Sequence, residues 1–455
     1  VWIDVPMDIQ SCLVDETTLA PWSPAQPGAL LALRGDRDLN PTALGDFCQD
    51  SDTAIRKKCR SIMAALKRAQ RPVFLAGSGV RLSGMQNTLL QLAERMHIPL
   101  VGGWGAYDLI PTNHPCYAGR PGTVGDRPGN FTVQNADFLL TLGCRLNIRQ
   151  VSYNWEGFAP KAWKAQVDID PSELAKPTLR NDLSVTADMA RFLSIFQEEL
   201  SDYRPEPSHG AYREWCRDRV QLYPVVSDQH RKPGKVNPYH FVDQLYAQLA
   251  ADDIVVMANG AASVVGCQAG RIQNKTRLVV NSGNASMGYD LPGAIGAALA
   301  GGGRRIICLA GDGSIMMNVQ ELASIAGEKL PIHIFLLNNN GYLSIRQTQA
   351  AYFSDNMLGI DGKTGVHFPE FTKMALGFGL TGSKIESNHD VPENIRKALT
   401  TPMPALHEVL LDQHQNFEPK TASKKLPDGT MITPPLEDMA PFLSREELGK
   451  NILTD

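Results

Sequence analysis

The sequence lacks several patterns that would assign it to other classes of protein. No two of its 8 cysteines form a CxxC pair, so neither a zinc site nor a disulfide framework is predicted. Basic residues form no block, and the formal net charge of -4 argues against a nucleic-acid-binding surface. The longest apolar stretch, 291–300, is interrupted by proline and glycine and is far shorter than the ~20 residues of a membrane helix. We therefore expect a cytoplasmic protein that binds neither nucleic acid nor membrane.

What the sequence does contain is typical of an α/β enzyme. It is 43% hydrophobic and 20% charged with 39 glycines, and 455 residues are enough for about two or three domains. Short apolar runs alternate with helical periodicity between 52 and 170, and the same alternation returns from 240 onward. This pattern predicts an α/β fold with two doubly wound parallel-sheet domains, the first of them Rossmann-like.

Proline-rich stretches suggest where these domains begin and end. We expect an N-terminal segment with a linker at 1–50, a central domain at 51–200, a second linker at 201–236, a last domain at 237–415 and a tail or lid at 416–455.

Polar residues follow two apolar runs of the last domain. The run 306–310 ends at Gly-Asp-Gly, and the run 332–337 ends at three asparagines. Apolar residues at helical spacing over 318–326 predict a helix between the two runs, so that the segment forms a strand–helix–strand unit. The carboxyl ends of two parallel strands joined in this way lie side by side. We therefore expect Asp312 and Asn339 to come together.

The chemistry of these residues suits a metal-bound diphosphate. The Asp312 carboxylate, the Asn339 amide oxygen and the Gly341 carbonyl form an all-oxygen set that Mg²⁺ accepts when phosphate oxygens complete its coordination. Glycines let a ligand approach the backbone, whose N–H groups bind phosphate. A lone Gly-Asp-Gly is also common as an ordinary turn. The expected cradle comprises Gly311, Gly313 and Ser314, with Asn259, Gly260 and Ala261 after the first strand of the domain.

The two motifs and their separation resemble the diphosphate motif of thiamine diphosphate (ThDP) enzymes. Around them, GDGSIMMNVQELASI, NASMGYDLPGAIGAALA and LPIHIFLLNNNGY are similar to acetolactate synthase large subunits and related 2-oxo-acid carboligases. The resemblance implies that the last domain binds the diphosphate of ThDP and that Asp312, Asn339 and Gly341 bind the Mg²⁺. It also implies that Tyr342, which begins the segment across the site mouth, contacts the cofactor.

Two further residues gain a role only from this resemblance. Met287 matches the bulky residue that bends ThDP into a V shape, and the Gly288 carbonyl is expected to meet the aminopyrimidine. The alternative for Met287 is an ordinary core side chain. Bending brings the cofactor's amino group against its reactive carbon as an internal base.

The central domain carries FAD in several members of the resembled family. A strand there ends in Gly-Ser-Gly, which is weak evidence for a diphosphate site, and the family stretch GVRFDDR appears at 143–149 without its acidic residues. A scaffold domain without flavin is the alternative. The candidate flavin residues are Gly77, Gly79, Arg145, Asp168 and Asp170.

The segment after the metal motif departs from the family. Acetolactate synthases usually have Gln-Trp-Gln where this chain has Gln347-Thr348-Gln349. Losing the aromatic face should loosen acceptor choice, since such packing discriminates a methylene by ~1–3 kcal/mol. Arg346 is either a ligand for a substrate carboxylate or a solvated surface residue.

The implied activity is a ThDP- and Mg²⁺-dependent carboligase that converts two pyruvate molecules to 2-acetolactate and CO₂, a step of branched-chain amino acid biosynthesis. A homodimer or homotetramer is expected, and a regulatory subunit stays open. The alternatives are a 2-oxo-acid decarboxylase, oxidase or C–C hydrolase on the same scaffold, and a non-catalytic fragment. VWIDVPMDIQ at the start resembles the last strand of the pyrimidine domain, whose activating Glu has no counterpart here. We therefore expect this chain alone to bind ThDP weakly and to turn over negligibly.

Overall fold

The computed structural model describes residues 17, 49–273, 275–353, 356–425 and 431–454. Residues 48–455 form one compact unit, and all contacts below lie within it. The predicted N-terminal segment, including its likeness to a pyrimidine domain, lies outside the described residues except at positions 17, 49 and 50.

The first half of this unit is a sheet of five parallel strands in the order β2-β1-β3-β4-β5. The strands are β1 (Pro72–Ala76), β2 (Leu100–Gly102), β3 (Phe138–Leu142), β4 (Trp163–Asp168) and β5 (Leu183–Thr186). Its helices are α3 (Asp52–Leu66), α4 (Ser78–Leu82), α5 (Gln86–Met96), α6 (Arg127–Gln134), α7 (Ile148–Val151), α8 (Pro171–Leu174), α9 (Met189–Glu199) and α10 (Pro207–Leu222).

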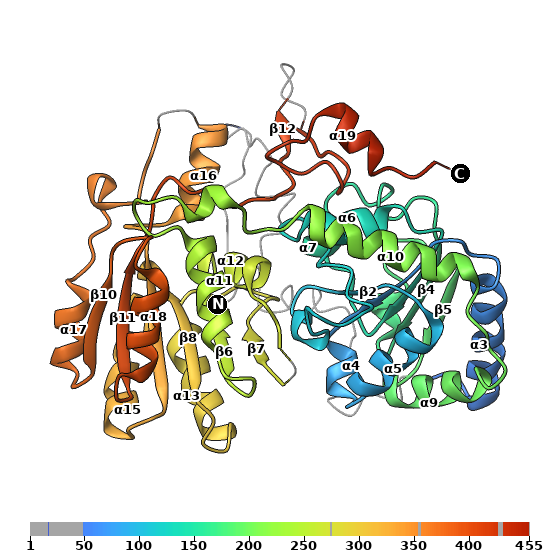
Figure 1. Cartoon of the computed structure of the whole chain (residues 1–455), viewed down its shortest axis with the longest axis horizontal. Helices are drawn as coiled ribbons and strands as arrows, with labels where there is room; N and C mark the ends of the chain where they lie inside the picture. Colours follow the sequence, from blue (N-terminus) through green and yellow to red (C-terminus); the bar gives the residue numbers. More distant parts are fainter. Residues whose placement is uncertain (1–16, 18–48, 274, 354–355, 426–430, 455) are drawn as a thin grey trace. The chain divides into compact units, whose positions relative to one another are not determined.

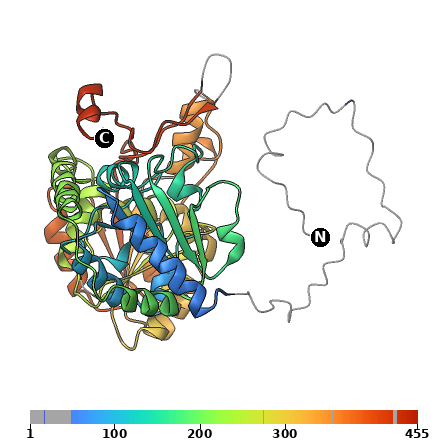
Figure 2. The same cartoon turned by 90° about the vertical axis from the view of Figure 1, so that its right-hand side faces the viewer.

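Both faces of this central sheet are covered, because successive strand residues point to opposite sides and most of them are apolar. One set, including Phe74 and Leu140, packs with α3, α5 and α9; the other, including Leu75 and Leu139, packs with α6 and α10. Figure 1 shows α9 and α10 on different sides of the sheet, and Figure 2 shows α3 in blue along it.

The helix α10 corrects one expectation. It occupies 16 residues of the predicted linker 201–236, and its Tyr212 and Cys216 are buried in the core. The Tyr212 hydroxyl donates to the Thr132 carbonyl at 2.6 Å. The prolines that suggested a linker stand at the ends of α10, where Pro207 begins the helix and Pro224 follows it. The segment forms a helix because its apolar side chains cover the second apolar face of the central sheet.

The second half is a sheet of six parallel strands in the order β10-β11-β9-β8-β6-β7. The strands are β6 (Ile254–Met257), β7 (Arg277–Val280), β8 (Ile306–Gly311), β9 (Ile332–Asn338), β10 (Thr381–Ile385) and β11 (Ala405–Leu410). The helices are α11 (Pro238–Gln248), α12 (Ala261–Ala269), α13 (Asp290–Ala300), α14 (Asp312–Ile315), α15 (Glu321–Gly327), α16 (Leu343–Tyr352), α17 (Phe371–Gly377) and α18 (Val391–Thr400). The 3₁₀ turn Met316–Asn318 precedes α15, so the helix expected from 318 begins three residues later.

The connections of this last sheet decide where a ligand can bind. Helices α11, α12 and α18 cover one face and α13, α15 and α17 the other, which confirms the predicted fold class of two doubly wound parallel sheets. The chain passes from β6 to β7 on one side and from β8 to β9 on the other, so β6 and β8 are neighbours whose connections diverge. Such a switch point leaves a crevice at the carboxyl ends of the strands.

The C-terminal segment contains β12 (Lys424–Lys425), β13 (Met431–Ile432) and α19 (Arg445–Lys450). The sequence shows little packing signal here, yet Leu436 and Met439 are buried. Side-chain amides on and just after α6 hold this segment: Asn130 donates to the Leu436 carbonyl and Asn135 to the Asn451 carbonyl, both at 2.8 Å. This part of the tail therefore packs on the central domain.

Charged side chains join the two sheets. Asp108 is buried between them, where it forms an ion pair with Arg81 at 2.6 Å and accepts a hydrogen bond from Arg277 at 2.7 Å. The buried guanidinium of Arg120 donates to the Gly270 carbonyl at 2.6 Å. Across the described residues, every helix is too short or too polar to cross a membrane.

Candidate active site

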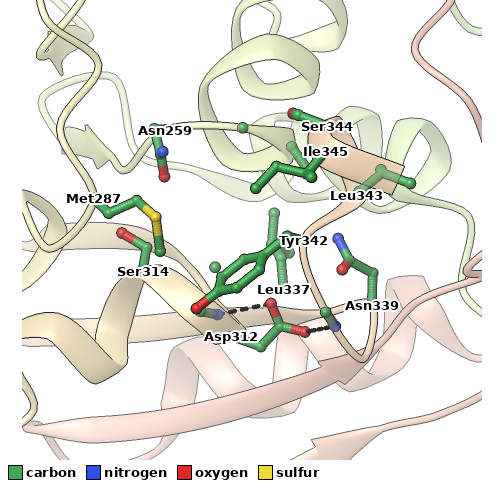
Figure 3. Close-up of a pocket in the computed structure, with 15 residues that line it drawn as sticks. Asn259, Met287, Asp312, Ser314, Leu337, Asn339, Tyr342, Leu343, Ser344 and Ile345 are labelled. Carbon is green, nitrogen blue, oxygen red and sulfur yellow. Dashed lines mark hydrogen bonds between the residues drawn. The ribbon is translucent and has the colours of Figure 1, made fainter. Parts of the chain in front are cut away.

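A pocket lies at the carboxyl ends of β6, β8 and β9, at the switch point of the last sheet (Figure 3). It contains about 510 Å³ of empty space, counting its open mouth. Segments that follow four strands, β6, β7, β8 and β9, supply the walls. The lining residues are Asn259, Gly260, Ala261, Met287, Gly311, Asp312, Gly313, Ser314, Leu337, Asn339, Gly341, Tyr342, Leu343, Ser344 and Ile345.

Asp312 lies on the floor of this pocket and is 3% exposed. Its carboxylate accepts from the Gly313 N–H at 2.8 Å and from the Gly341 N–H at 2.9 Å (Figure 3). The second bond ties the loop after β9 to the end of β8. The structure therefore brings together the two strand ends that the sequence places 27 residues apart.

The three consecutive asparagines have different tasks. Asn338 shapes the turn, since its side-chain oxygen accepts from the Asn340 N–H at 2.9 Å and its amide donates to Glu408 at 2.7 Å. Asn340 adopts a left-handed conformation with φ of 57°. Asn339 is buried beside the pocket, and its Oδ1 atom has no hydrogen-bond partner among the described residues. An unpaired buried acceptor is costly unless a ligand completes it.

These groups fit a magnesium ion held jointly with a phosphorylated ligand. Burial raises the pKa of Asp312 to about 6, although hydrogen bonds from backbone N–H groups act to lower it. A neighbouring cation would stabilise the charged carboxylate. The free Oδ1 of Asn339 is the kind of neutral oxygen that Mg²⁺ accepts. In the part of the chain that the structure describes, His, Cys, Asp and Glu form no metal-binding group of three. Ligand oxygens must therefore complete the coordination.

Two glycines at this site are required by close contacts. A Cβ atom at Gly341 would lie 1.9 Å from the Ile360 carbonyl oxygen, and the residue has φ of 141°. A Cβ atom at Gly313 would lie 2.1 Å from the Tyr342 ring. The ring packs edge-on against Phe368 with centroids 6.4 Å apart. Gly313 thus gives Tyr342 its place in the pocket wall.

The opposite wall is the start of α12. Gly260 precedes the helix with φ of 58°, a conformation that favours glycine. The first N–H groups of a helix have no acceptor within it, so this end of α12 offers donors for an anion. Asn259, Gly260 and Ala261 all line the pocket as predicted.

Met287 lines the pocket, whereas Gly288 stands just behind it. The Gly288 N–H donates to Ser314 Oγ at 2.9 Å, and its carbonyl accepts from Asn318 Nδ2 at 2.8 Å. Gly288 has φ of 81°, and a Cβ atom there would lie 2.7 Å from Asn318. The peptide groups before and after the Gly288 Cα atom are therefore both held, which orients the preceding Met287.

Sequence reasoning missed two residues of this support. Asn318 holds the Gly288 carbonyl, and Asp290 is fully buried at the start of α13 with its Oδ2 atom lacking a partner among the described residues. Burial raises the pKa of Asp290 to about 6, although a hydrogen bond with Ser314 opposes this. The sequence signal that could have identified Asp290 is an acidic residue directly before the apolar stretch 291–300, where a buried charge is rare.

The candidate flavin residues lie outside this pocket, and their polar groups are engaged locally. The Gly77 N–H donates to the Leu142 carbonyl at 2.8 Å and the Gly79 N–H to the Gly143 carbonyl at 3.0 Å. The remaining contacts are Arg145 with Glu173 at 2.5 Å, Asp168 with the Asp170 N–H at 3.1 Å, and Asp170 with the Ser172 N–H at 2.8 Å. The flavin site stays a prediction.

Comparisons with known proteins agree with this division of the chain. The central domain of thiamine pyrophosphate enzymes matches residues 59–195, and their C-terminal TPP binding domain matches residues 258–409. The second match spans the pocket floor and Met287.

Relatives of this chain include proteins named as large subunits of acetolactate synthase. The chain is 28% identical to isozyme 1 of Escherichia coli (strain K12) over 92% of its own length and 68% of that protein. It is also 28% identical to a probable large subunit from Methanococcus aeolicus, over 87% of this chain and 64% of the relative, and to that of Parasynechococcus marenigrum (strain WH8102), over 92% and 64%. The chain thus spans about two thirds of the length of these relatives.

The chain thus contains the central domain and the C-terminal TPP binding domain of thiamine pyrophosphate enzymes, joined in that order, and the second of them holds the pocket described above.

Proposed function

We propose that this chain is the ThDP- and Mg²⁺-binding part of an acetolactate synthase-like carboligase, which forms 2-acetolactate and CO₂ from two pyruvate molecules. One observation carries the proposal most directly. Asp312 and Asn339 converge in one pocket, and the Asn339 oxygen has no partner among the described residues. The names of the relatives support the choice of reaction.

The cofactor, when bound, supplies the electron sink for decarboxylation of the 2-oxo acid. The residues of the chain bind and orient it. Asp312, Asn339 and the Gly341 carbonyl would hold Mg²⁺, while the N–H groups at the start of α12 and beside Gly313 would meet phosphate oxygens. Met287 would fix the bend of the cofactor, because Ser314 and Asn318 hold the adjoining Gly288 peptide.

The proposal includes partners that lie beyond this chain. The activating carboxyl group would come from a pyrimidine domain supplied across a dimer interface, in a homodimer or homotetramer of the cytoplasm. Exposed apolar side chains near the pocket, Met317 at 50% and Ile345 at 44%, are suited to such a contact. A regulatory subunit belongs to the same proposal, since the relatives are named large subunits. FAD in the central domain stays a separate prediction.

Calorimetric titration of the chain with ThDP tests the proposal, with Mg²⁺ in one arm and a chelator in the other. We expect weak binding that requires Mg²⁺, and negligible turnover of pyruvate. Adding the pyrimidine domain should strengthen binding and give 2-acetolactate. If acetaldehyde, acetate or hydrolysis products form in its place, the enzyme is a decarboxylase, an oxidase or a hydrolase, respectively. Equal ThDP affinity with Mg²⁺ and with the chelator would contradict the proposed metal site.

A further inference from the structure

The segment 418–421 of the C-terminal tail is fixed in place beside α16. It is anchored at successive residues by contacts with different parts of the fold. These contacts are Glu418 with His230 at 2.8 Å, the Pro419 carbonyl with Gln268 at 2.7 Å, the Lys420 N–H with the Ala440 carbonyl at 2.9 Å, and the Thr421 N–H with the Thr123 carbonyl at 2.8 Å.

This segment carries a cation without a counter-charge. Lys420 is half-buried, and its ammonium donates to Gln347 Oε1 at 3.0 Å. No carboxylate of the described residues lies within ion-pair distance of it. Burial lowers the pKa of Lys420, and no acidic group opposes that effect. Proteins rarely bury lysine unless an anion accompanies it.

The contact with Gln347 brings this ammonium next to the pocket. Gln347 is four residues after Leu343 and three after Ser344 on α16, so the three side chains share one face of the helix. Leu343 and Ser344 line the pocket. The Nε2 atom of Gln347 is buried and has no acceptor among the described residues. Among the described residues, Gln347 Nε2 therefore has no acceptor, and the Lys420 ammonium, from a segment 73 residues away, has no carboxylate partner.

Arg346, the neighbouring cation, is in a different state. It lies 3.8 Å from Asp361 and donates to the Asn340 carbonyl at 3.3 Å. Its charge is thus matched within the fold, whereas its Nη1 atom is buried and has no hydrogen-bond partner among the described residues. Its predicted role toward a substrate carboxylate is therefore less well supported than that of the unmatched Lys420.

We propose that Lys420 and Gln347 form a subsite for the carboxylate of the acceptor 2-oxo acid, an inference that rests on the proposed carboligase function. An ion pair with the donor's carboxylate would stabilise a charge that departs as CO₂, which helps the ground state more than the transition state. The acceptor keeps its carboxylate throughout. A fixed ammonium and an amide N–H can both bind that group and so orient the acceptor carbonyl toward the pocket.

The test compares a charged and a neutral probe on the whole chain. Pyruvate and its uncharged analogue methyl pyruvate are titrated into wild-type protein and into the variants Lys420→Met, Lys420→Arg and Gln347→Leu, with and without ThDP and Mg²⁺. Lys164→Met is the matched control, because Lys164 is another partly buried lysine of lowered pKa, on the distant strand β4. Thermal unfolding without ligand checks the folding of each variant.

We expect Lys420→Met to bind pyruvate about 10- to 100-fold more weakly, as for loss of a hydrogen bond to a charged group. Lys420→Arg should retain most of the affinity, Gln347→Leu should lose part of it, and methyl pyruvate should bind all variants alike. ThDP affinity should not change in any of them.

Equal pyruvate affinity in wild type and Lys420→Met would overturn the subsite, as would an equal loss for methyl pyruvate. If Lys420→Met fails to fold, the loss in Gln347→Leu and its absence in Lys164→Met decide the question. If the wild-type protein does not bind ThDP in the presence of Mg²⁺, the proposed function is refuted instead. The titrations of pyruvate without cofactor would then still test the role of Lys420.

Discussion

At the ends of β1 and β3 in the central sheet, the glycines Gly77 and Gly79 pack against the backbone of Gly143 and donate their N–H groups to local carbonyls. At the ends of β8 and β9 in the last sheet, Asp312 and Asn339 flank a pocket, and one of their oxygens has no partner among the described residues. The two sheets share the same parallel architecture. They differ in whether the polar groups at the strand ends are already satisfied.

This difference teaches that a glycine-rich strand end is not by itself a phosphate site. Glycine permits a close approach, but the approaching partner can be the protein's own backbone, as it is at Gly77. Unpaired polar atoms beside a cavity are the more specific sign of a ligand. We call a strand end closed when its polar groups are paired within the protein, and open when an unpaired polar atom lies beside a pocket. The following predictions test the contrast between the two.

The largest effect is expected at the open end. Asp312→Asn keeps the shape of the side chain but removes the charge, and Asn339→Ala removes the unpaired oxygen. Losing a metal ligand should cost at least as much as losing an outer-shell partner, so Mg²⁺-dependent ThDP affinity should fall by about 100-fold or more. Titration calorimetry measures it.

Asp168→Asn is the matched control, since Asp168 is a buried acid at a strand end of the central sheet and burial raises its pKa too. It should leave ThDP affinity unchanged. A comparable loss in the control would show that both sheets take part in binding the cofactor.

A pair of glycine substitutions should separate stability from binding. A Cβ atom at Gly77 would lie 2.2 Å from the Gly143 carbonyl oxygen, and backbone cannot easily move away. Gly77→Ala should therefore lower the free energy of unfolding by about 1–3 kcal/mol without affecting ThDP.

Gly313→Ala should behave in the opposite way. Its Cβ would meet the Tyr342 ring, a side chain that can rotate into the pocket, so ThDP affinity should fall more than stability. Chemical denaturation and calorimetry on the two variants measure both quantities. The same response in both would mean that the two strand ends are not functionally distinct.

A smaller effect is expected from the support behind Met287. Asn318→Ala removes the donor to the Gly288 carbonyl, which should weaken ThDP binding by about 1 kcal/mol because the turn that follows Met287 is less well held. Asn181→Ala, which removes a side-chain hydrogen bond to Gln166 in the central domain, is the control. Unchanged ThDP affinity in Asn318→Ala would show that this turn does not contribute to cofactor binding.

The smallest effect is expected at the closed end. Arg145 is 76% exposed and pairs with Glu173, and such surface pairs contribute about 0–1 kcal/mol. Arg145→Ala should therefore unfold at nearly the wild-type temperature. Added FAD, followed by its visible absorbance after gel filtration, should distinguish the two flavin alternatives: loss of bound FAD in this variant alone would establish Arg145 as a flavin ligand.

Much of the fold and of the cofactor site could be predicted because it depends on local patterns. Buried parallel strands are continuous apolar runs, and Gly311-Asp312-Gly313 and Asn339 stand directly after two of them. The linker prediction failed at α10 because prolines mark the ends of a helix as well as a loop. Asn318 and Asp290 were missed because their partners, Gly288 and Ser314, are close only after the chain has turned back.

By itself, the sequence determined the two alternating sheets, the residues at the strand ends and their convergence, since strand period and parallel connectivity follow from apolar spacing. Only the tertiary structure decided which glycines pack against backbone atoms, that the Asn339 Oδ1 atom is left without a partner among the described residues, and that Lys420 meets Gln347. The physical reason is that burial and hydrogen-bond satisfaction are properties of packed neighbours. Neighbours brought together from distant segments leave no periodic trace along the chain.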